Sequence, residues 1–474
     1  MNETRLSGSF RDPAGHIVLI NGHIHRRIEP AGLEGYRRLM DSGLYAGLTS
    51  KGLLIPHQDL GPQADQPGAA TVLRPELVPM VSYPYEWSLS QLRDAALATL
   101  DAQREALRVG MVLKDASAYN VQFHRGRPVL IDTLSFEPYR GGPWFAYRQF
   151  CQHFYAPLLV AATVDPRLMR SSSVFIDGLP LRVASRMLPR SSWLGPGPLF
   201  HIHLHARAEE KWSTSTVAKA RADTSTPVHV EADLQVRLNS DAPNTRSIEA
   251  VVDSLRRAIE GVRWSHKSHW SSYYAEGESY SAEAFARKAD VVAGWLERIR
   301  PGTVWDLGAN TGHFSKAAAR VGATAVAFDS DPACVETLYR EVREARVEGV
   351  LPLVLDLANP SAGIGWANAE RMTLVERGPA DLLLALAVTH HLAVGNNVPF
   401  AAIADYFARI GKRAIVEFVP KDDPMVQRML SARADVFPQY NEAAFEQAFA
   451  EHFQIDDRTV LAPSNRILYL MTAR

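Results

Sequence analysis

The feature that most constrains the fold is a glycine loop between a short apolar strand and a helix. Residues 303–305 (TVW) run into residues 306–312 (DLGANTG), after which a helix is expected. Glycines at a strand-to-helix turn let the backbone approach a ligand and leave helical N–H groups facing it. Asp329 lies 23 residues after Asp306, at the end of the next apolar stretch. A carboxylate at that place can accept hydrogen bonds from both hydroxyls of a ribose, so the pattern predicts a nucleoside ligand.

The spacing and charge of the loop argue against a dinucleotide. The loop reads GANTG rather than GxGxxG, so the spacing that suits a pyrophosphate is absent. Asp306 would also face a pyrophosphate with like charge, whereas it would attract a ligand that carries an ammonium or a sulfonium. A ribose together with a cationic group describes S-adenosylmethionine.

Helical and strand patterns alternate from about residue 282 to the last residue. Strands separated by helices predict an α/β domain with a doubly wound parallel sheet. Only residues 462–465 join the last two strands, which is too short for a crossover helix, so we expect these two to pair antiparallel. The expected helices are 282–299, 312–320 and 332–345, and the expected strands are 303–305, 323–328, 351–355, 382–387, 413–418, 458–461 and 467–472.

The ordered motifs of residues 281–474 resemble the class I S-adenosylmethionine-dependent methyltransferases. They are DLGANTG, FDSD, VLDLANP and DLLLALAVTHHL, followed by the antiparallel hairpin. The resemblance implies a Rossmann-like sheet of seven strands with an antiparallel last strand; the alternative is a Rossmann-like domain that binds no cofactor. The residues implied at the cofactor are Asp306, Gly308 and Gly312 for its methionine part, Asp329 for its ribose, and Asp356 and Leu357 for its adenine. Asn310, Ser330 and Ala387 are implied at the cofactor as well, without assignment to one part of it.

Two histidines and a glutamate are the candidates for catalysis. Methyl transfer is an in-line displacement that depends on alignment, and a base is needed only where the acceptor atom is protonated. His390 and His391 follow the fourth strand and could deprotonate a hydroxyl or position an amine. The alternative is that one caps a helix and the other packs in the loop. Glu417 ends the fifth strand and either faces the acceptor or pairs with an arginine.

Residues 112–134 carry a second pattern of chemistry. Asp115, Asn120 five residues later, a hairpin and then Asp132 form the arrangement that phosphoryl transfer uses for its hydroxyl and its magnesium. The stretch resembles the catalytic and metal loops of the protein-kinase and aminoglycoside-phosphotransferase superfamily, and residues 89–108 resemble the long helix before them. No glycine-rich phosphate loop precedes it, and Lys51 is the one lysine before Lys114. We expect an α+β, kinase-like domain without phosphotransferase activity; the alternative is that Asp115 and Asn120 cap a turn.

Two other groups of side chains are ambiguous. The aromatic cluster after residue 263 could close over the cofactor or pack between domains; it comprises Trp264, Trp270, Tyr273, Tyr274 and Tyr280. On a strand, His201, His203 and His205 would project from one face. No carboxylate or cysteine pattern near them supports a metal site, so we expect no metal.

Length and composition divide the chain into four segments. At about 150 residues per domain, 474 residues suggest two or three domains. We place a kinase-like domain at 1–212, a polar linker at 213–247, a helical and aromatic cap segment at 248–281 and the methyltransferase domain at 282–474. The net charge of −1 gives no global attraction to nucleic acid. Neither a signal peptide nor a membrane-spanning stretch is visible, so we expect a cytoplasmic protein.

The sequence therefore predicts a methyltransferase that uses S-adenosylmethionine to methylate an oxygen or nitrogen of a small-molecule acceptor. The Asn/Asp-Pro-Pro motif of the family's amino-methyltransferases is absent, which argues against methylation of a base or a glutamine. Two alternatives remain open. One is a phosphotransferase or nucleotide sensor with a regulatory S-adenosylmethionine domain, and the other is a non-catalytic adaptor. The identity of the acceptor and the oligomeric state are not predicted.

Overall fold

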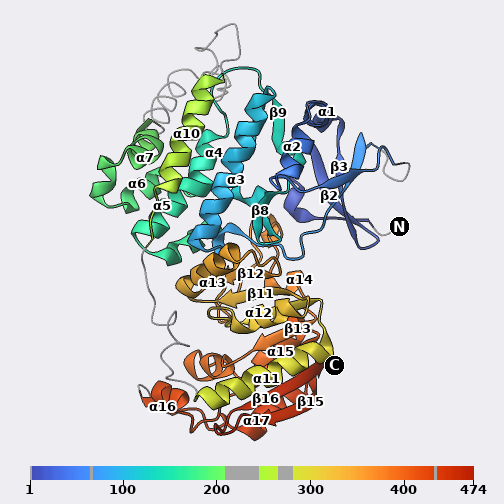
Figure 1. Cartoon of the computed structure of the whole chain (residues 1–474), viewed down its shortest axis with the longest axis vertical. Coiled ribbons are helices and arrows are strands. Elements are labelled where there is room, and N and C mark those ends of the chain that lie inside the picture. The colour runs from blue at the N-terminus through green and yellow to red at the C-terminus, as the bar shows by residue number, and fades with distance from the viewer. Residues whose placement is uncertain (1–2, 64–67, 209–244, 265–280, 432–434) are drawn as a thin grey trace.

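The computed structural model of the chain describes residues 3–63, 68–208, 245–264, 281–431 and 435–474. They form two parts stacked along the long axis of the molecule, with residues 3–264 in one and 281–474 in the other (Figure 1). No helix among the described residues is both long enough and apolar enough to cross a membrane.

The N-terminal part begins with a five-stranded antiparallel sheet in the order β1-β2-β3-β5-β4. Asn21 and Gly22 make the turn between β2 and β3, and both have positive φ angles, of 49° and 80°. An Asn-Gly pair suits this turn because both residues tolerate the left-handed conformation that a two-residue hairpin requires. The elements are β1 (Glu3–Arg5), β2 (Gly15–Ile20), β3 (His23–Ile28), α1 (Leu33–Asp41), α2 (Leu44–Ser50), β4 (His57–Asp59) and β5 (Thr71–Pro75).

Helix α3 (Leu89–Arg108) is the long helix that the sequence predicts, and it is the centre of the rest of the N-terminal part. It starts with a reciprocal cap in which the backbone N–H of Gln91 donates to Ser88 Oγ and that of Ser88 donates to Gln91 Oε1. The predicted hairpin follows as β7 (Val121–His124) and β8 (Arg127–Leu130). The remaining elements are β6 (Met111–Leu113), β9 (Phe136–Pro138), α4 (Tyr147–Phe150), α5 (Ala156–Thr163), the 3₁₀ helix η7 (Pro166–Ser173), α6 (Leu181–Met187) and α7 (Pro196–Pro198).

Helix α10 (Arg246–Glu260) packs along α3, although its place in the sequence falls within the predicted cap segment. Two arginine–aspartate pairs join the helices, Arg104 with Asp253 and Arg256 with Asp101. The helix expected at the start of the segment 248–281 is therefore present, but it is part of the N-terminal core. The predicted linker lies outside the described residues except for its last three positions, and so does the aromatic cluster except for Trp264.

The C-terminal part is built on one seven-stranded mixed sheet in the order β12-β11-β10-β13-β14-β16-β15. The five adjacent strands from β12 to β14 pair in parallel, and β16 runs antiparallel to both β14 and β15, so the predicted pairing of the last two strands is confirmed. The strands are β10 (Thr303–Leu307), β11 (Thr324–Asp329), β12 (Val350–Val354), β13 (Leu382–Ala385), β14 (Arg413–Phe418), β15 (Phe453–Val460) and β16 (Ile467–Ala473).

Helices connect these strands, and apolar residues from both faces of the sheet are buried beneath them. Asp331 caps α13, the helix expected over 332–345, by accepting from the backbone N–H of Ala333 at 2.8 Å, ahead of Pro332 in the first turn. The helices are α11 (Ala282–Ile299), α12 (His313–Arg320), α13 (Pro332–Glu344), α14 (Leu374–Arg377), α15 (Phe400–Ile410), α16 (Pro424–Ser431) and α17 (Glu442–Ala450).

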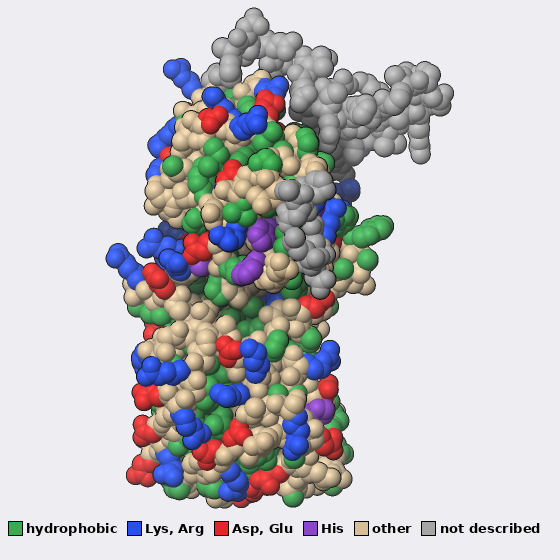
Figure 2. Space-filling view, turned by 90° about the vertical axis from the view of Figure 1, so that its right-hand side faces the viewer, with side chains coloured by type: hydrophobic (Ala, Val, Ile, Leu, Met, Phe, Trp, Pro, Cys, Tyr) green, Lys and Arg blue, Asp and Glu red, His purple; other side chains and the backbone are tan. Residues whose placement is uncertain are grey.

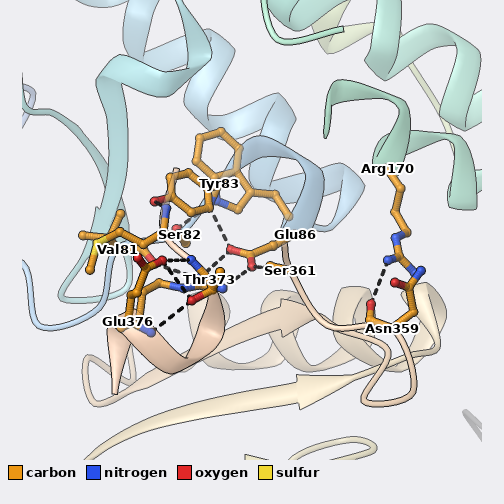
Figure 3. A network of polar contacts seen from close by, with 12 residues as sticks. Val81, Ser82, Tyr83, Glu86, Arg170, Asn359, Ser361, Thr373 and Glu376 are labelled. Atoms are coloured by element: carbon orange, nitrogen blue, oxygen red, sulfur yellow. Dashed lines mark hydrogen bonds and ion pairs between the residues drawn. The ribbon is translucent and has the colours of Figure 1, made fainter. Parts of the chain in front are cut away.

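The two parts are joined by a buried ion pair between Glu86, which is labelled in Figure 3, and Arg377. Arg377 Nη2 donates to Glu86 Oε1 at 2.6 Å and Nη1 to Oε2 at 2.9 Å, and each side chain is 1% exposed. Arg377 Nη1 also donates to the carbonyl of Val81, and Ser361 donates to Glu86. A bidentate pair that is closed off from water fixes the segment before α3 against α14.

Candidate functional site

The glycine loop turns sharply between β10 and α12, as its sequence requires. Gly308 and Gly312 have φ angles of 78° and 75°, and Asn310 has a φ angle of 51°. A Cβ atom at Gly308 would lie 2.5 Å from Val388 Cγ2, and one at Gly312 would lie 2.5 Å from Leu338 Cδ2. Neither position can accept a larger residue without a shift of its neighbours. Both positions therefore require glycine, for their positive φ angles and for the lack of room for a side chain.

Asp306 lies under this loop as an almost fully buried acid. It is 2% exposed, and Ser315 Oγ donates to its Oδ2 at 2.6 Å. Burial raises the pKa of Asp306 to about 6, because the charged carboxylate loses its hydration. A buried carboxylate of this kind is stabilised by any cation that approaches it.

Asp329 ends β11 and holds the loop in place. The backbone N–H of Asn310 donates to Asp329 Oδ2 at 2.7 Å, and that of Asp331 donates to Oδ1 at 2.8 Å. Burial raises the pKa of Asp329 also to about 6. The two acids that the sequence singles out therefore meet at one glycine loop, at the carboxyl ends of β10 and β11.

A chain of buried charges extends from Asp306 under the neighbouring strand ends. Lys288 Nζ lies 2.7 Å from Glu417 Oε2, and Arg466 Nη1 lies 3.5 Å from Glu417 Oε1. Arg466 also donates to both carboxylate oxygens of Asp423, at 2.7 and 3.0 Å. Lys288 and Arg466 are each 1% exposed, and Glu417 is 0% exposed. Of the two interpretations of Glu417, the structure shows the ion pair, with a lysine as well as an arginine.

This network holds three carboxylates and two cations. The pKa of Lys288 is lowered overall, because burial outweighs the opposing effect of Glu417 and the weaker one of Asp306. If all five groups are charged, the network carries one net negative charge. Sequence reasoning missed Lys288 and Arg466, although a lysine on the apolar face of α11 was a visible signal.

The loop after β13 brings both candidate histidines to the same edge of the sheet. Ala387 has a φ angle of 55°, so the chain turns directly after the strand. His390 is 1% exposed, and its ring centroid lies 4.2 Å from that of His391. Burial lowers the pKa of His390 well below its usual value and lowers that of His391 as well. Both imidazoles are therefore neutral near pH 7, the form that accepts a proton.

Ser330 and Asp356 line a cavity of about 210 Å³ beside the ends of β11 and β12. Residues from the N-terminal part, including Tyr85 and Met169, line the same cavity. Leu357, the other residue implied at the adenine, packs against the large hydrophobic core and is not among the lining residues. The cavity thus adjoins the acid at the end of β11.

In the N-terminal part, Asp115, Asn120 and Asp132 come together as the second pattern predicts. Asn120 Nδ2 donates to Ser135 Oγ, which in turn donates to Asp132 Oδ2 at 2.8 Å. Asp132 Oδ1 lies 2.7 Å from Arg26 Nη2, an arginine of β3 that sequence reasoning missed. Lys51 instead pairs with Glu105 on α3, at 2.8 Å.

The turn-capping alternative for Asp115 also finds support. Asp115 Oδ1 accepts from the backbone N–H of Ser117 at 3.0 Å and from Gln149 Nε2 at 2.8 Å. The pKa of Asp115 is raised, mainly by burial and next by the charge of Asp132. Asp115 and Asp132 therefore each have hydrogen-bond or ion-pair partners that the protein itself supplies.

The interpretation of His201, His203 and His205 as one strand face is wrong. Residues 199–204 form a π-helix, so side chains two positions apart diverge. His201 hydrogen-bonds to Tyr147 and Ser254, whereas His203 hydrogen-bonds to Ser185 and Ser192. The described part of the chain holds no group of three or more His, Cys, Asp or Glu side chains that is placed to bind a metal.

Comparison with solved structures gives low scores. Magnesium protoporphyrin IX methyltransferase (ChlM) from Synechocystis PCC 6803, with bound SAH, matches with a TM-score of 0.32 and 19% identity over 43% of this chain and 94% of that one. The bifunctional kinase-methyltransferase WbdD matches with a TM-score of 0.29 and 17% identity over 42% of each chain.

Comparison with protein sequences gives one extensive match. No family model matches the chain. Nodulation protein NoeA of Rhizobium meliloti (strain 1021) is 34% identical over 476 residues, which cover 98% of this chain and 95% of that protein. A match of this length spans both parts of the structure. The chain therefore belongs to the family of nodulation protein NoeA.

Proposed function

We propose that the chain is an S-adenosylmethionine-dependent methyltransferase whose cofactor binds at the carboxyl ends of β10, β11 and β12. The observation that carries the proposal is the meeting of Asp306 and Asp329 at one glycine loop, where Gly308 leaves no room for a larger residue. Asp306 and the buried network behind it favour a cationic ligand group, and Asp329 is an acceptor for ribose hydroxyls. Gly308, Asn310, Gly312, Ser330, Asp356, Leu357 and Ala387 complete the proposed cofactor site.

The acceptor is proposed to be a small molecule that is methylated on oxygen or nitrogen. When bound, the cofactor supplies an electrophilic methyl group on its sulfonium. His390 or His391 then serves as a neutral base for a protonated acceptor atom. The face drawn in Figure 2 supports a small molecule, since positive and negative side chains alternate over the C-terminal part and no patch of one sign marks it. Glu417 is assigned to the ion network rather than to the acceptor.

Changing Asp329 to asparagine tests the cofactor assignment. The amide side chain of Asp329→Asn would keep an oxygen acceptor but lose the charge, and a charge-assisted hydrogen bond contributes about 1.5–3 kcal/mol. We therefore expect the full chain with Asp329→Asn to bind S-adenosylhomocysteine about 10- to 100-fold more weakly in calorimetry. Asp331→Asn is the matched control, because asparagine also caps helices and Asp331 already serves as the cap of α13. Equal affinity of wild type and Asp329→Asn would rule out the ribose role.

The pKa of about 6 at Asp306 predicts a pH dependence of cofactor binding. A cation beside Asp306 stabilises the carboxylate, so binding lowers its pKa and releases a proton wherever the free protein holds one. Affinity for S-adenosylmethionine should be constant from pH 7 to 8 and should fall below pH 6, by at most about tenfold per pH unit for each of the two acids, Asp306 and Asp329, whose pKa is about 6. Calorimetry in buffers of different ionisation enthalpy should show proton release near pH 6 and none at pH 8. Affinity that is unchanged down to pH 5 would contradict the role of Asp306.

We expect the N-terminal part to be inactive in phosphoryl transfer. That chemistry needs preorganised charged groups around the γ-phosphate. In this chain, however, Asp132 already forms an ion pair with Arg26, and Lys51 forms one with Glu105. ATP and magnesium should leave the melting temperature of the full chain unchanged, and Asp132→Asn should leave methyl transfer intact. ATP hydrolysis that disappears in Asp132→Asn would instead favour the phosphotransferase alternative.

A further inference from the structure

The cavity of about 210 Å³ lies between the two parts of the chain rather than within either one. On the C-terminal side it is lined by Ser330 and Asp356, which follow the ends of β11 and β12. On the N-terminal side it is lined by Tyr85 and Trp87, in the segment before α3, and by Met169 of η7. A cavity of this volume is smaller than a typical complete ligand site, so it suits one end of a larger ligand.

Hydrogen bonds that cross the interface fix both walls of the cavity. On one side, the backbone N–H of Ser90 donates to Glu336 Oε2 at 2.9 Å, and Gln91 Nε2 donates to the carbonyl of Pro352 at 3.0 Å. On the other side, Arg170 Nη2 donates to the carbonyl of Asn359 at 3.1 Å (Figure 3). The N-terminal wall is therefore held at the ends of β11 and β12, beside the proposed cofactor site.

Tyr85 is a side chain of the N-terminal wall with an unused hydrogen-bonding group. It is 6% exposed, and its hydroxyl is buried without a hydrogen-bond partner among the described residues. By contrast, Trp87 Nε1 donates to Ser82 Oγ at 2.9 Å, and Ser88 Oγ caps α3. Buried hydroxyls almost always have a partner in folded proteins, so Tyr85, which lines the cavity, has a hydroxyl that is available to a polar ligand atom. Burial also raises the pKa of Tyr85, which keeps the hydroxyl protonated and able to donate.

We propose that the adenosine end of the cofactor occupies this cavity and that the Tyr85 hydroxyl donates a hydrogen bond to a ring nitrogen of its purine. The cofactor site is then shared between the two parts: the loop at Asp306 and Asp329 belongs to one, and Tyr85 belongs to the other. The inference rests on the proposed function. It also means that residues 281–474 alone would form an incomplete cofactor site.

Tyr85→Phe in the full chain tests the proposal, because it removes the hydroxyl and leaves the ring in place. One neutral hydrogen bond corresponds to about a threefold to tenfold change in affinity, so Tyr85→Phe should bind S-adenosylhomocysteine that much more weakly in calorimetry. The matched control is Tyr406→Phe on α15, which also has a buried hydroxyl without a partner among the described residues but does not line the cavity. Tyr406→Phe should bind as the wild type does.

Hydrogen–deuterium exchange of the wild type gives a second readout that needs no variant. S-adenosylhomocysteine should slow exchange in residues 84–89 and 166–173 as well as in residues 306–313. Slowed exchange only in the C-terminal segments, together with equal affinity of Tyr85→Phe and wild type, would overturn the shared site and leave the proposed function standing. Failure of the wild type to bind S-adenosylhomocysteine at all would overturn both.

Discussion

Replacement of His390 or His391 by alanine should lower turnover about 100- to 10,000-fold, the usual cost of losing a general base. Both side chains lie directly after β13, at the edge of the sheet that carries the glycine loop, and burial lowers the pKa of each. Neutral imidazoles can take a proton from the acceptor as the methyl group is transferred. His390 Nδ1 is buried without a partner among the described residues, so this histidine still has an unused ring atom.

The measurement is kcat with the true acceptor, together with the affinity for S-adenosylhomocysteine. A base acts on the rate, so the affinity should change by less than about twofold in the variant that loses the base. His452→Ala, after α17, serves as a control that should keep both values. If both single variants of the pair retain full activity, neither histidine is a base and alignment of the acceptor alone accounts for the rate.

Breaking the pair between Glu86 and Arg377 should have the largest effect on stability. Removing one partner of a buried ion pair leaves an uncompensated charge and costs about 3–5 kcal/mol. Arg377→Met should therefore lower the free energy of unfolding of the full chain by about that amount, measured by urea denaturation. The double variant Glu86→Gln, Arg377→Met removes both charges and should recover most of the loss.

A surface pair provides the control for this experiment. Arg409 and Asp405 on α15 are both more than half exposed, so Arg409→Met should cost less than about 1 kcal/mol. If Arg377→Met lowered the free energy of unfolding by a similarly small amount, the stability of the chain would not depend on the pair between Glu86 and Arg377. That result would also weaken the argument that the N-terminal wall of the cavity is fixed.

The C-terminal fold follows closely from local sequence signals. The apolar stretches, the glycine loop and the Asp331-Pro332 cap each act within a few residues, so the strands and helices around the loop could be predicted. The antiparallel end of the sheet followed from the short connection at residues 462–465. In the N-terminal part, local signals of the same kind were sufficient to predict helix α3 and the hairpin of β7 and β8.

Contacts between distant residues could not be predicted in this way. Lys288 and Glu417 are far apart in sequence, and so are Arg26 and Asp132, yet each pair is an ion pair in the structure. The cavity also needs residues from both parts, and nothing local in either part indicates it. The structure of residues 201–205 has a different cause. Pro196 and Pro198 suit the start of a helix, so the alternation of histidines that follows them does not produce a strand.

The most direct test of the central claim is methyl transfer from S-adenosylmethionine carrying a tritiated methyl group. The full chain is incubated with an extract of cells that lack the gene, because an unmethylated acceptor should accumulate there. We expect tritium to enter one class of extracted compound with the wild type, with an equal amount of S-adenosylhomocysteine formed, and much less to do so with Asp329→Asn. A wild-type chain that binds S-adenosylmethionine but forms neither labelled product nor S-adenosylhomocysteine would contradict the account and favour a regulatory or adaptor role.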